Sequence, residues 1–155
     1  MCFGSSAGAC CSPRRRHDGL LHKLSTSWRI RMTRELFDKL VAEALDQLPE
    51  EFREKLENVE VIVEDFADLE TLRSLDLQSR WDLLGLYVGV PLTHRSFFSI
   101  STLPERIYLY YHPILRQARR PRDLVKTIRD VVIHEVGHHF GFDDDELEAM
   151  SQRTE

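Results

Sequence analysis

The amino-acid sequence predicts an α+β fold in a single domain. The chain has 155 residues, a length that is typical of one domain. Helical hydrophobic patterns come first, three short strand-like segments follow among further helical turns, and a long amphipathic helix comes near the end. This order of elements is typical of α+β domains.

The first clear element is a helix that begins after Thr33, whose hydroxyl suits the N-cap position. Its apolar stripe has the spacing of a helix that is buried on one side, and consists of Phe37, Leu40, Val41, Ala44 and Leu45. Pro49 interrupts this pattern and can open a second short helix, in which Phe52 and Leu56 face inward.

Three later segments have the composition of strands. Residues 59–64 (VEVIVE) are rich in β-branched residues, and their inward set is Val59, Val61 and Val63. Residues 83–91 (LLGLYVGVP) indicate a strand that runs into a turn, and residues 107–111 (IYLYY) indicate a third strand.

Helical segments flank these strands. We expect a helical turn around residues 69–77 and a helix from Pro113 to about Arg119. The last long helix spans residues 124–140. On a helical wheel, its core-facing side consists of Val125, Ile128, Val132, Val136 and Phe140. The roughly opposite side consists of Thr127, Val131, His134 and His138. We therefore expect one face to pack into the core and the other to present ligands to a cleft.

Residues 134–144 (HEVGHHFGFDD) have the pattern HExxHxxGxxD. Because His134 and His138 lie one helical turn apart, both imidazoles can reach one metal ion. Glu135 is placed to take a proton from a metal-bound water. Gly141 can end the helix with a positive φ and turn the chain back, which would bring Asp144 to the metal as a third ligand. Three protein ligands plus water are typical of a catalytic zinc site, so we expect one Zn²⁺ per chain.

Purely structural interpretations of the same residues remain open. The helix can be an ordinary amphipathic helix with two solvated histidines. Asp144, or one of the neighbouring acids Asp143, Asp145 and Glu146, can instead N-cap a last short helix, with Leu147 and Met150 packing beneath it. His139 projects about 100° away from His138 and is expected to be a half-exposed surface histidine.

Residues 1–31 differ from the rest of the chain. They lack periodicity, contain all three cysteines and carry a net charge of +5, whereas the remainder carries −10. We expect residues 1–31 to be a disordered N-terminal extension and residues 32–155 to be the folded domain, with Met32 as the natural start.

Composition also limits which classes of partner and which cellular compartment are expected. An acidic body without a basic stripe argues against nucleic acid as a partner. No apolar run approaches the length of about 20 residues that a membrane-spanning helix needs, and no secretory signal is evident. The absence of cysteine from residues 32–155 fits a reducing compartment, so we expect a cytoplasmic protein.

Beyond these patterns, residues 32–150 resemble the small bacterial zincin-like metallopeptidases that are described as having a minimal zincin fold. The segments that carry the resemblance are 83–96, 103–110 and 134–145. The resemblance implies a minimal zincin-like fold, with a small twisted sheet packed against the HExxH helix and additional helices. It also implies that His134, His138 and Asp144 are the zinc ligands and that Glu135 is the catalytic base.

The expected function is that of a zinc metallopeptidase that hydrolyses a peptide or protein substrate with a metal-activated water. One alternative is a zinc-binding protein-interaction module with little or no peptidase activity. Another is a regulator that binds nucleic acid through its basic N-terminal residues.

The substrate is expected to add a strand to an exposed sheet edge, with Ile107 to Tyr111 as the candidate edge. A group that stabilises the oxyanion must come from upstream of the motif. The candidates are Tyr108, Tyr110, Tyr111, His112, His94 and Arg95.

Overall fold

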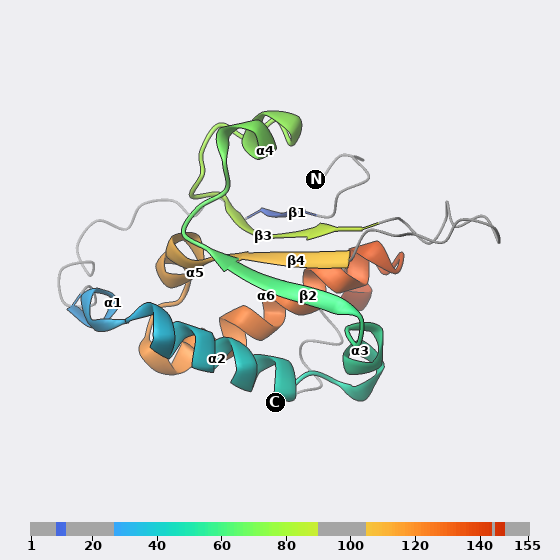
Figure 1. The fold of residues 1–155 in the computed structure, drawn as a ribbon, viewed down its shortest axis with the longest axis horizontal. Helices are drawn as coiled ribbons and strands as arrows, with labels where there is room; N and C mark the ends of the chain where they lie inside the picture. Colours follow the sequence, from blue (N-terminus) through green and yellow to red (C-terminus); the bar gives the residue numbers. More distant parts are fainter. Residues whose placement is uncertain (1–8, 12–26, 90–104, 144, 148–155) are drawn as a thin grey trace.

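The structure, a computed structural model, describes residues 9–11, 27–89, 105–143 and 145–147. Its centre is a sheet with the strand order β1–β3–β4–β2. The strands are β1 (Ala9–Cys11), β2 (Val59–Glu64), β3 (Leu83–Val88) and β4 (Glu105–Tyr110). β3 is antiparallel to both β1 and β4, whereas β2 is parallel to β4. Figure 1 shows the four strands side by side across the middle of the molecule.

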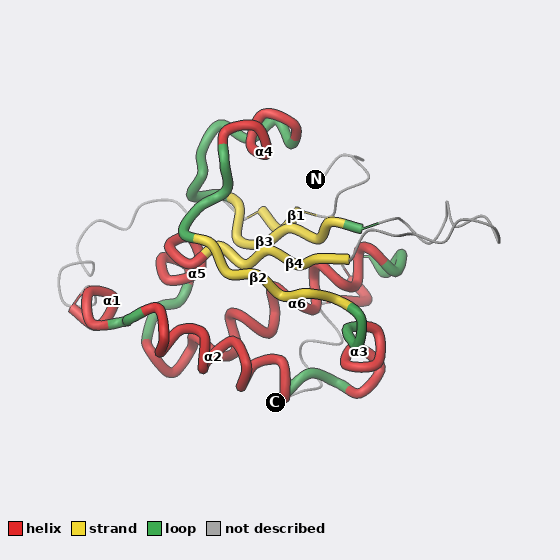
Figure 2. The backbone as a smooth tube through the Cα atoms, viewed as in Figure 1, coloured by secondary structure: helices red, strands yellow, loops and turns green. Residues whose placement is uncertain are grey.

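The helices lie on both sides of this sheet. They are α1 (Ser27–Arg31), α2 (Arg34–Asp46), α3 (Glu50–Lys55), α4 (Leu69–Ser74), α5 (Tyr111–Gln117) and α6 (Leu124–His139). α2 and α6 cover one face, and α4 lies on the other side (Figure 2). The predicted α+β architecture is therefore confirmed. Among the described residues, no helix has the length and apolar character needed to cross a membrane.

The predicted pattern of α2 is confirmed. Phe37, Val41 and Ala44 are buried in the main core. The Thr33 hydroxyl accepts a hydrogen bond from the Leu36 N–H at 3.3 Å, as expected of an N-cap. The apolar stripe read from the sequence thus faces α6 and the sheet.

The inward set of β2 is also as predicted, because Val59, Val61 and Val63 pack against the main core. Val61 lies opposite Ile107 of β4 in the parallel register. This pairing corrects one expectation from the sequence. β4 is an interior strand with β2 on one side and β3 on the other, so it offers no free edge to a substrate.

α6 is buried on more sides than the helical wheel predicted. Ile128, Val132 and Val136 are buried in the main core, as expected. Val131, which the wheel placed on the cleft side, is also buried, since α6 packs closely against β3. On the side expected to face a cleft, Thr127, His134 and His138 are partly exposed.

Two elements of the structure, β1 and α1, lie within residues 1–31. β1 pairs with β3, and α1 packs against the core through Trp28. The Arg29 guanidinium donates hydrogen bonds to the carbonyl oxygens of Leu115 at 2.7 Å and Ala118 at 2.8 Å. α1 has only five residues, too few to show periodicity, and these tertiary contacts hold it in place.

These contacts lead to a prediction about truncation. Deleting residues 1–31 should leave a folded domain, because the main core is built from later residues. It should be less stable than a chain lacking only residues 1–26, by about 2–4 kcal/mol, because it loses Trp28 and both Arg29 hydrogen bonds. Urea denaturation of the two truncated chains measures the difference. Equal midpoints would show that α1 adds nothing to stability.

Candidate metal centre

The side chains of His134 and His138 meet on the C-terminal half of α6. Their Nε2 atoms lie 2.9 Å apart and their ring centroids 4.2 Å apart. Two nitrogens that bind one tetrahedral zinc ion, each at about 2.0–2.1 Å, lie about 3.4 Å apart. The pair is within about 0.5 Å of that spacing, and imidazole nitrogen is a donor that zinc prefers. The donor set of these two residues therefore fits zinc.

Glu135, the residue after the first histidine, lies in the interface between α6 and β3. Its side chain is 0% exposed, and its Oε2 atom accepts a hydrogen bond from the backbone N–H of Tyr87 at 3.0 Å. A backbone donor at this distance fixes the position of the carboxylate, because charge-assisted hydrogen bonds are among the stronger ones in proteins. β3 thus orients the residue that the motif assigns as a base.

The close approach of α6 to β3 depends on Gly85. A Cβ atom at this position would lie 2.8 Å from Val131 Cγ1, 3.2 Å from the backbone oxygen of Tyr108 and 3.3 Å from Glu135 Cγ. A glycine inside a strand often marks such a close contact. Sequence reasoning missed this role, although the glycine within the run LLGLYV was the available signal.

Replacing Gly85 with alanine should therefore lower the free energy of unfolding by about 1–3 kcal/mol, the usual cost of overpacking. The cost should shrink when Val131 is alanine as well, because the shorter side chain makes room for the new Cβ. Urea denaturation of the two single variants and the double variant gives this coupling. If Gly85→Ala costs the same stability with valine or alanine at position 131, the contact with the Val131 side chain is not the cause of the cost.

α6 ends at His139, and Gly141, the glycine predicted to end it, follows the C-cap residue Phe140. Gly141 has a φ of +86°, in the left-handed region that favours glycine. The N–H of Phe142 donates to the Gly137 oxygen at 3.0 Å, and the N–H of Gly141 donates to the His138 oxygen at 3.1 Å. These two bonds form a Schellman motif, which turns the chain back toward the helix.

The returning chain is fixed at two points. Asp143 Oδ1 accepts from the Glu146 N–H at 2.9 Å, and Glu146 Oε2 accepts from the Asp143 N–H at 3.0 Å, which is a reciprocal capping box. Leu147 is buried and packs on Gly137, where any Cβ would collide with it. Asp143 is thus the acidic residue that caps the last turn, and the predicted packing of Leu147 is confirmed.

Asp144 lies outside the described residues. Among those described, no third His, Cys, Asp or Glu joins the two histidines in a group able to hold a metal ion. The residues on either side of Asp144 belong to the capped turn, which folds back onto α6 at Gly137, one residue before His138.

His139 is partly exposed, as the sequence predicted, and it also makes a specific contact with β3. Its ring stacks on Tyr87 with centroids 4.0 Å apart and an interplanar angle of 26°. The Tyr87 hydroxyl donates to Glu105 Oε2 at 2.6 Å. His139 therefore helps to fix β3 against α6, and Tyr87 is a site residue that sequence reasoning did not single out.

The structure does not bring the oxyanion candidates in β4 to the histidines. Tyr108 and Tyr110 pack in the smaller hydrophobic cluster with Leu72 of α4, on the other face of the sheet from α6. Burial raises the pKa of the Tyr110 hydroxyl, which stays protonated within that cluster.

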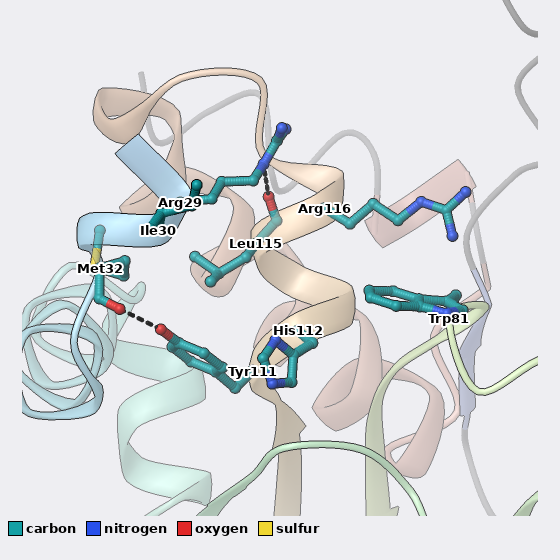
Figure 3. A pocket seen from close by; sticks show the side chains of 8 residues that line it. All are labelled: Arg29, Ile30, Met32, Trp81, Tyr111, His112, Leu115 and Arg116. Atoms are coloured by element: carbon teal, nitrogen blue, oxygen red, sulfur yellow. Dashed lines mark hydrogen bonds between the residues drawn. The ribbon is translucent and has the colours of Figure 1, made fainter. Parts of the chain in front are cut away.

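The remaining oxyanion candidates also lie elsewhere. Tyr111 and His112 line a cavity beside α1 and α5 (Figure 3). His94 and Arg95 fall outside the described residues. The described residues therefore add Tyr87 and Gly85 to the surroundings of the motif, and they place no predicted oxyanion donor there.

Comparisons with known proteins bear on this site. A model of the zincin-like metallopeptidase family matches residues 56–153, which is more than half of the chain. A solved structure of a conserved hypothetical protein from T. thermophilus is 27% identical and has a TM-score of 0.46. That similarity covers 78% of this chain and 99% of the other. No curated protein matches the sequence.

Proposed function

Because the chain belongs to the zincin-like metallopeptidase family, we propose that it is a zinc-dependent peptidase with Glu135 as its general base. Its α+β architecture, with α6 packed on a small sheet, is the minimal zincin-like fold expected from the sequence. One observation carries the proposal. The Nε2 atoms of His134 and His138 converge to 2.9 Å, and the residue that follows His134 is a buried carboxylate that β3 holds in place.

The chemistry follows from these positions. His134 and His138, with Asp144 as the third ligand, would hold one zinc ion. Zinc, when bound, lowers the pKa of a water molecule and polarises the carbonyl of the scissile bond. Glu135 accepts a proton from the attacking water and passes it to the leaving amine. The N–H of Tyr87 keeps the carboxylate oriented through the reaction by donating to Oε2.

The position of β4 in the middle of the sheet also changes where a substrate would bind. β3 carries Tyr87 and lies next to Glu135, so we place an extended peptide along its outer edge. In this chain β1 pairs with that edge, with Ala9 opposite Leu86 and Cys10 opposite Gly85. A peptide that binds there must displace residues 9–11.

Cleavage of a quenched fluorescent peptide library tests the proposal. Purified protein should cleave members of the library, lose activity with 1,10-phenanthroline and regain it when zinc is added. A chain lacking residues 1–26 keeps α1 but uncovers β3, so it should cleave faster than the full chain. Activity that survives the chelator would contradict the zinc mechanism. Equal rates for the two chains would contradict the binding edge but not the mechanism.

A further inference from the structure

A cavity of about 540 Å³ lies beside α1 and α5 (Figure 3). These two helices lie toward the opposite end of the molecule from the C-terminal end of α6 (Figure 1). We call it the α1–α5 cavity. Its lining comes from α1 and Met32, from Trp81 in the loop before β3, and from α5. Cavities of roughly 300–1,000 Å³ are the size that binds small organic molecules.

The apolar part of the lining suits a flat ring system. Trp81, Tyr111 and His112 supply aromatic rings, and Leu115 supplies an aliphatic surface (Figure 3). The rings are held before any ligand arrives, because His112 stacks on Phe66 with centroids 4.8 Å apart and the Tyr111 hydroxyl donates to the Met32 oxygen. Preorganised rings reduce the entropy lost on binding.

The charged part of the lining is positive. Arg29 and Arg116 line the cavity, and none of the lining residues is acidic. The two acceptors bound by Arg29 are neutral carbonyl oxygens, so these two hydrogen bonds do not neutralise its positive charge. Among the described residues, no carboxylate lies within 4.0 Å of either guanidinium. Burial lowers the pKa of Arg29, but a guanidinium stays protonated in proteins.

Arg116 is able to change its partner. It is exposed, and its guanidinium lies over the Trp81 ring at 5.2 Å. An exposed cation–π contact of this kind contributes about 0.5–1 kcal/mol, which is less than a charge-assisted hydrogen bond to an anion. Arg116 can therefore exchange the indole face for an acidic group at the cavity mouth.

We propose that the α1–α5 cavity binds a small organic anion with an aromatic body and a carboxylate or sulfonate group. The aromatic body lies against Trp81 and Leu115, and the acidic group binds Arg116. A small molecule fits better than an extended peptide, because no strand among the described residues lines the cavity to offer main-chain hydrogen bonds.

Isothermal titration with 2-naphthoate and 2-naphthamide tests this proposal on the full chain. The two probes share a ring system and differ in charge. Naphthoate should bind at least about tenfold more tightly than naphthamide, the difference expected for one charge-assisted contact. Arg116→Gln should remove most of that difference, and it should change naphthamide binding little.

A matched control separates local recognition from overall charge. Arg53→Gln removes the same charge from an exposed position on α3, toward the other end of the molecule (Figure 1), and should leave naphthoate affinity unchanged. A second variant, Ile30→Glu, adds a carboxylate at a residue that lines the cavity and is 82% exposed, so folding should be kept. It should weaken naphthoate binding.

Three results would overturn the proposal. The first is no measurable binding of naphthoate, and the second is equal affinity for the two probes. The third is an equal loss of naphthoate affinity with Arg53→Gln and Arg116→Gln. If an acetylated tetrapeptide with a C-terminal tryptophan binds more tightly than naphthoate, the ligand of the cavity is a peptide and not a small molecule. The titration measures neither zinc nor hydrolysis, so its outcome is independent of the proposed peptidase activity.

Discussion

Glu135→Gln should retain close to one zinc ion per chain while losing peptide hydrolysis by about 10²-fold or more, the usual scale for a missing general base. The glutamine has the same shape, and its amide oxygen can still accept from the Tyr87 N–H that holds the buried glutamate. It cannot take a proton from water. Metal analysis and library cleavage measure the two effects on the same sample.

The matched control is Glu60→Gln, the same substitution at an exposed position on β2 whose carboxylate pairs with Arg106 at 3.0 Å. It should keep both zinc and activity. Equal cleavage by the wild type and Glu135→Gln would remove Glu135 from the mechanism. Zinc retention by both proteins with cleavage by neither would favour a zinc-binding interaction module.

Asp144→Ala should weaken zinc binding by at least about tenfold, whereas Asp143→Ala should weaken it much less. Loss of a ligand removes a direct bond to the metal. The Asp143 carboxylate instead accepts from the Glu146 N–H in the capping box, so its loss should cost about 1 kcal/mol of stability. Competition with a chromogenic chelator gives both affinities. A larger effect at Asp143 would mean that the third ligand is misassigned by one residue.

Local sequence patterns correctly predicted the features that depend on residues within a single element. Spacing or backbone preference determines the stripe and cap of α2, the inward valines of β2 and the end of α6 just before Gly141. The sequence alone was therefore enough to predict these elements.

The boundary between β4 and α5 was less predictable. The sequence pattern extended the strand to Tyr111 and began the helix at Pro113, whereas α5 begins at Tyr111. Proline is tolerated in the first helical turn because its missing N–H has no partner there. Pro113 therefore marks the first turn of α5 and not its first residue.

Local sequence patterns could not predict the contacts between segments that are distant in the sequence. The interior position of β4 depends on which strands pair, and the hydrogen bonds of Arg29 reach residues far along the chain. The depth of Glu135 in the α6–β3 interface likewise depends on Gly85, a residue far earlier in the sequence. Each of these features involves packing between elements that a single-element pattern does not contain.

We propose that His134, His138 and Asp144 together hold one zinc ion. A crystal structure of the zinc-loaded protein, with anomalous differences collected on both sides of the zinc absorption edge, tests it most directly. We expect one strong peak per chain, about 2.0–2.2 Å from the Nε2 atoms of both histidines and from a carboxylate oxygen of Asp144. A peak coordinated by other residues, or a zinc ion bound by the histidines without Asp144, would contradict it.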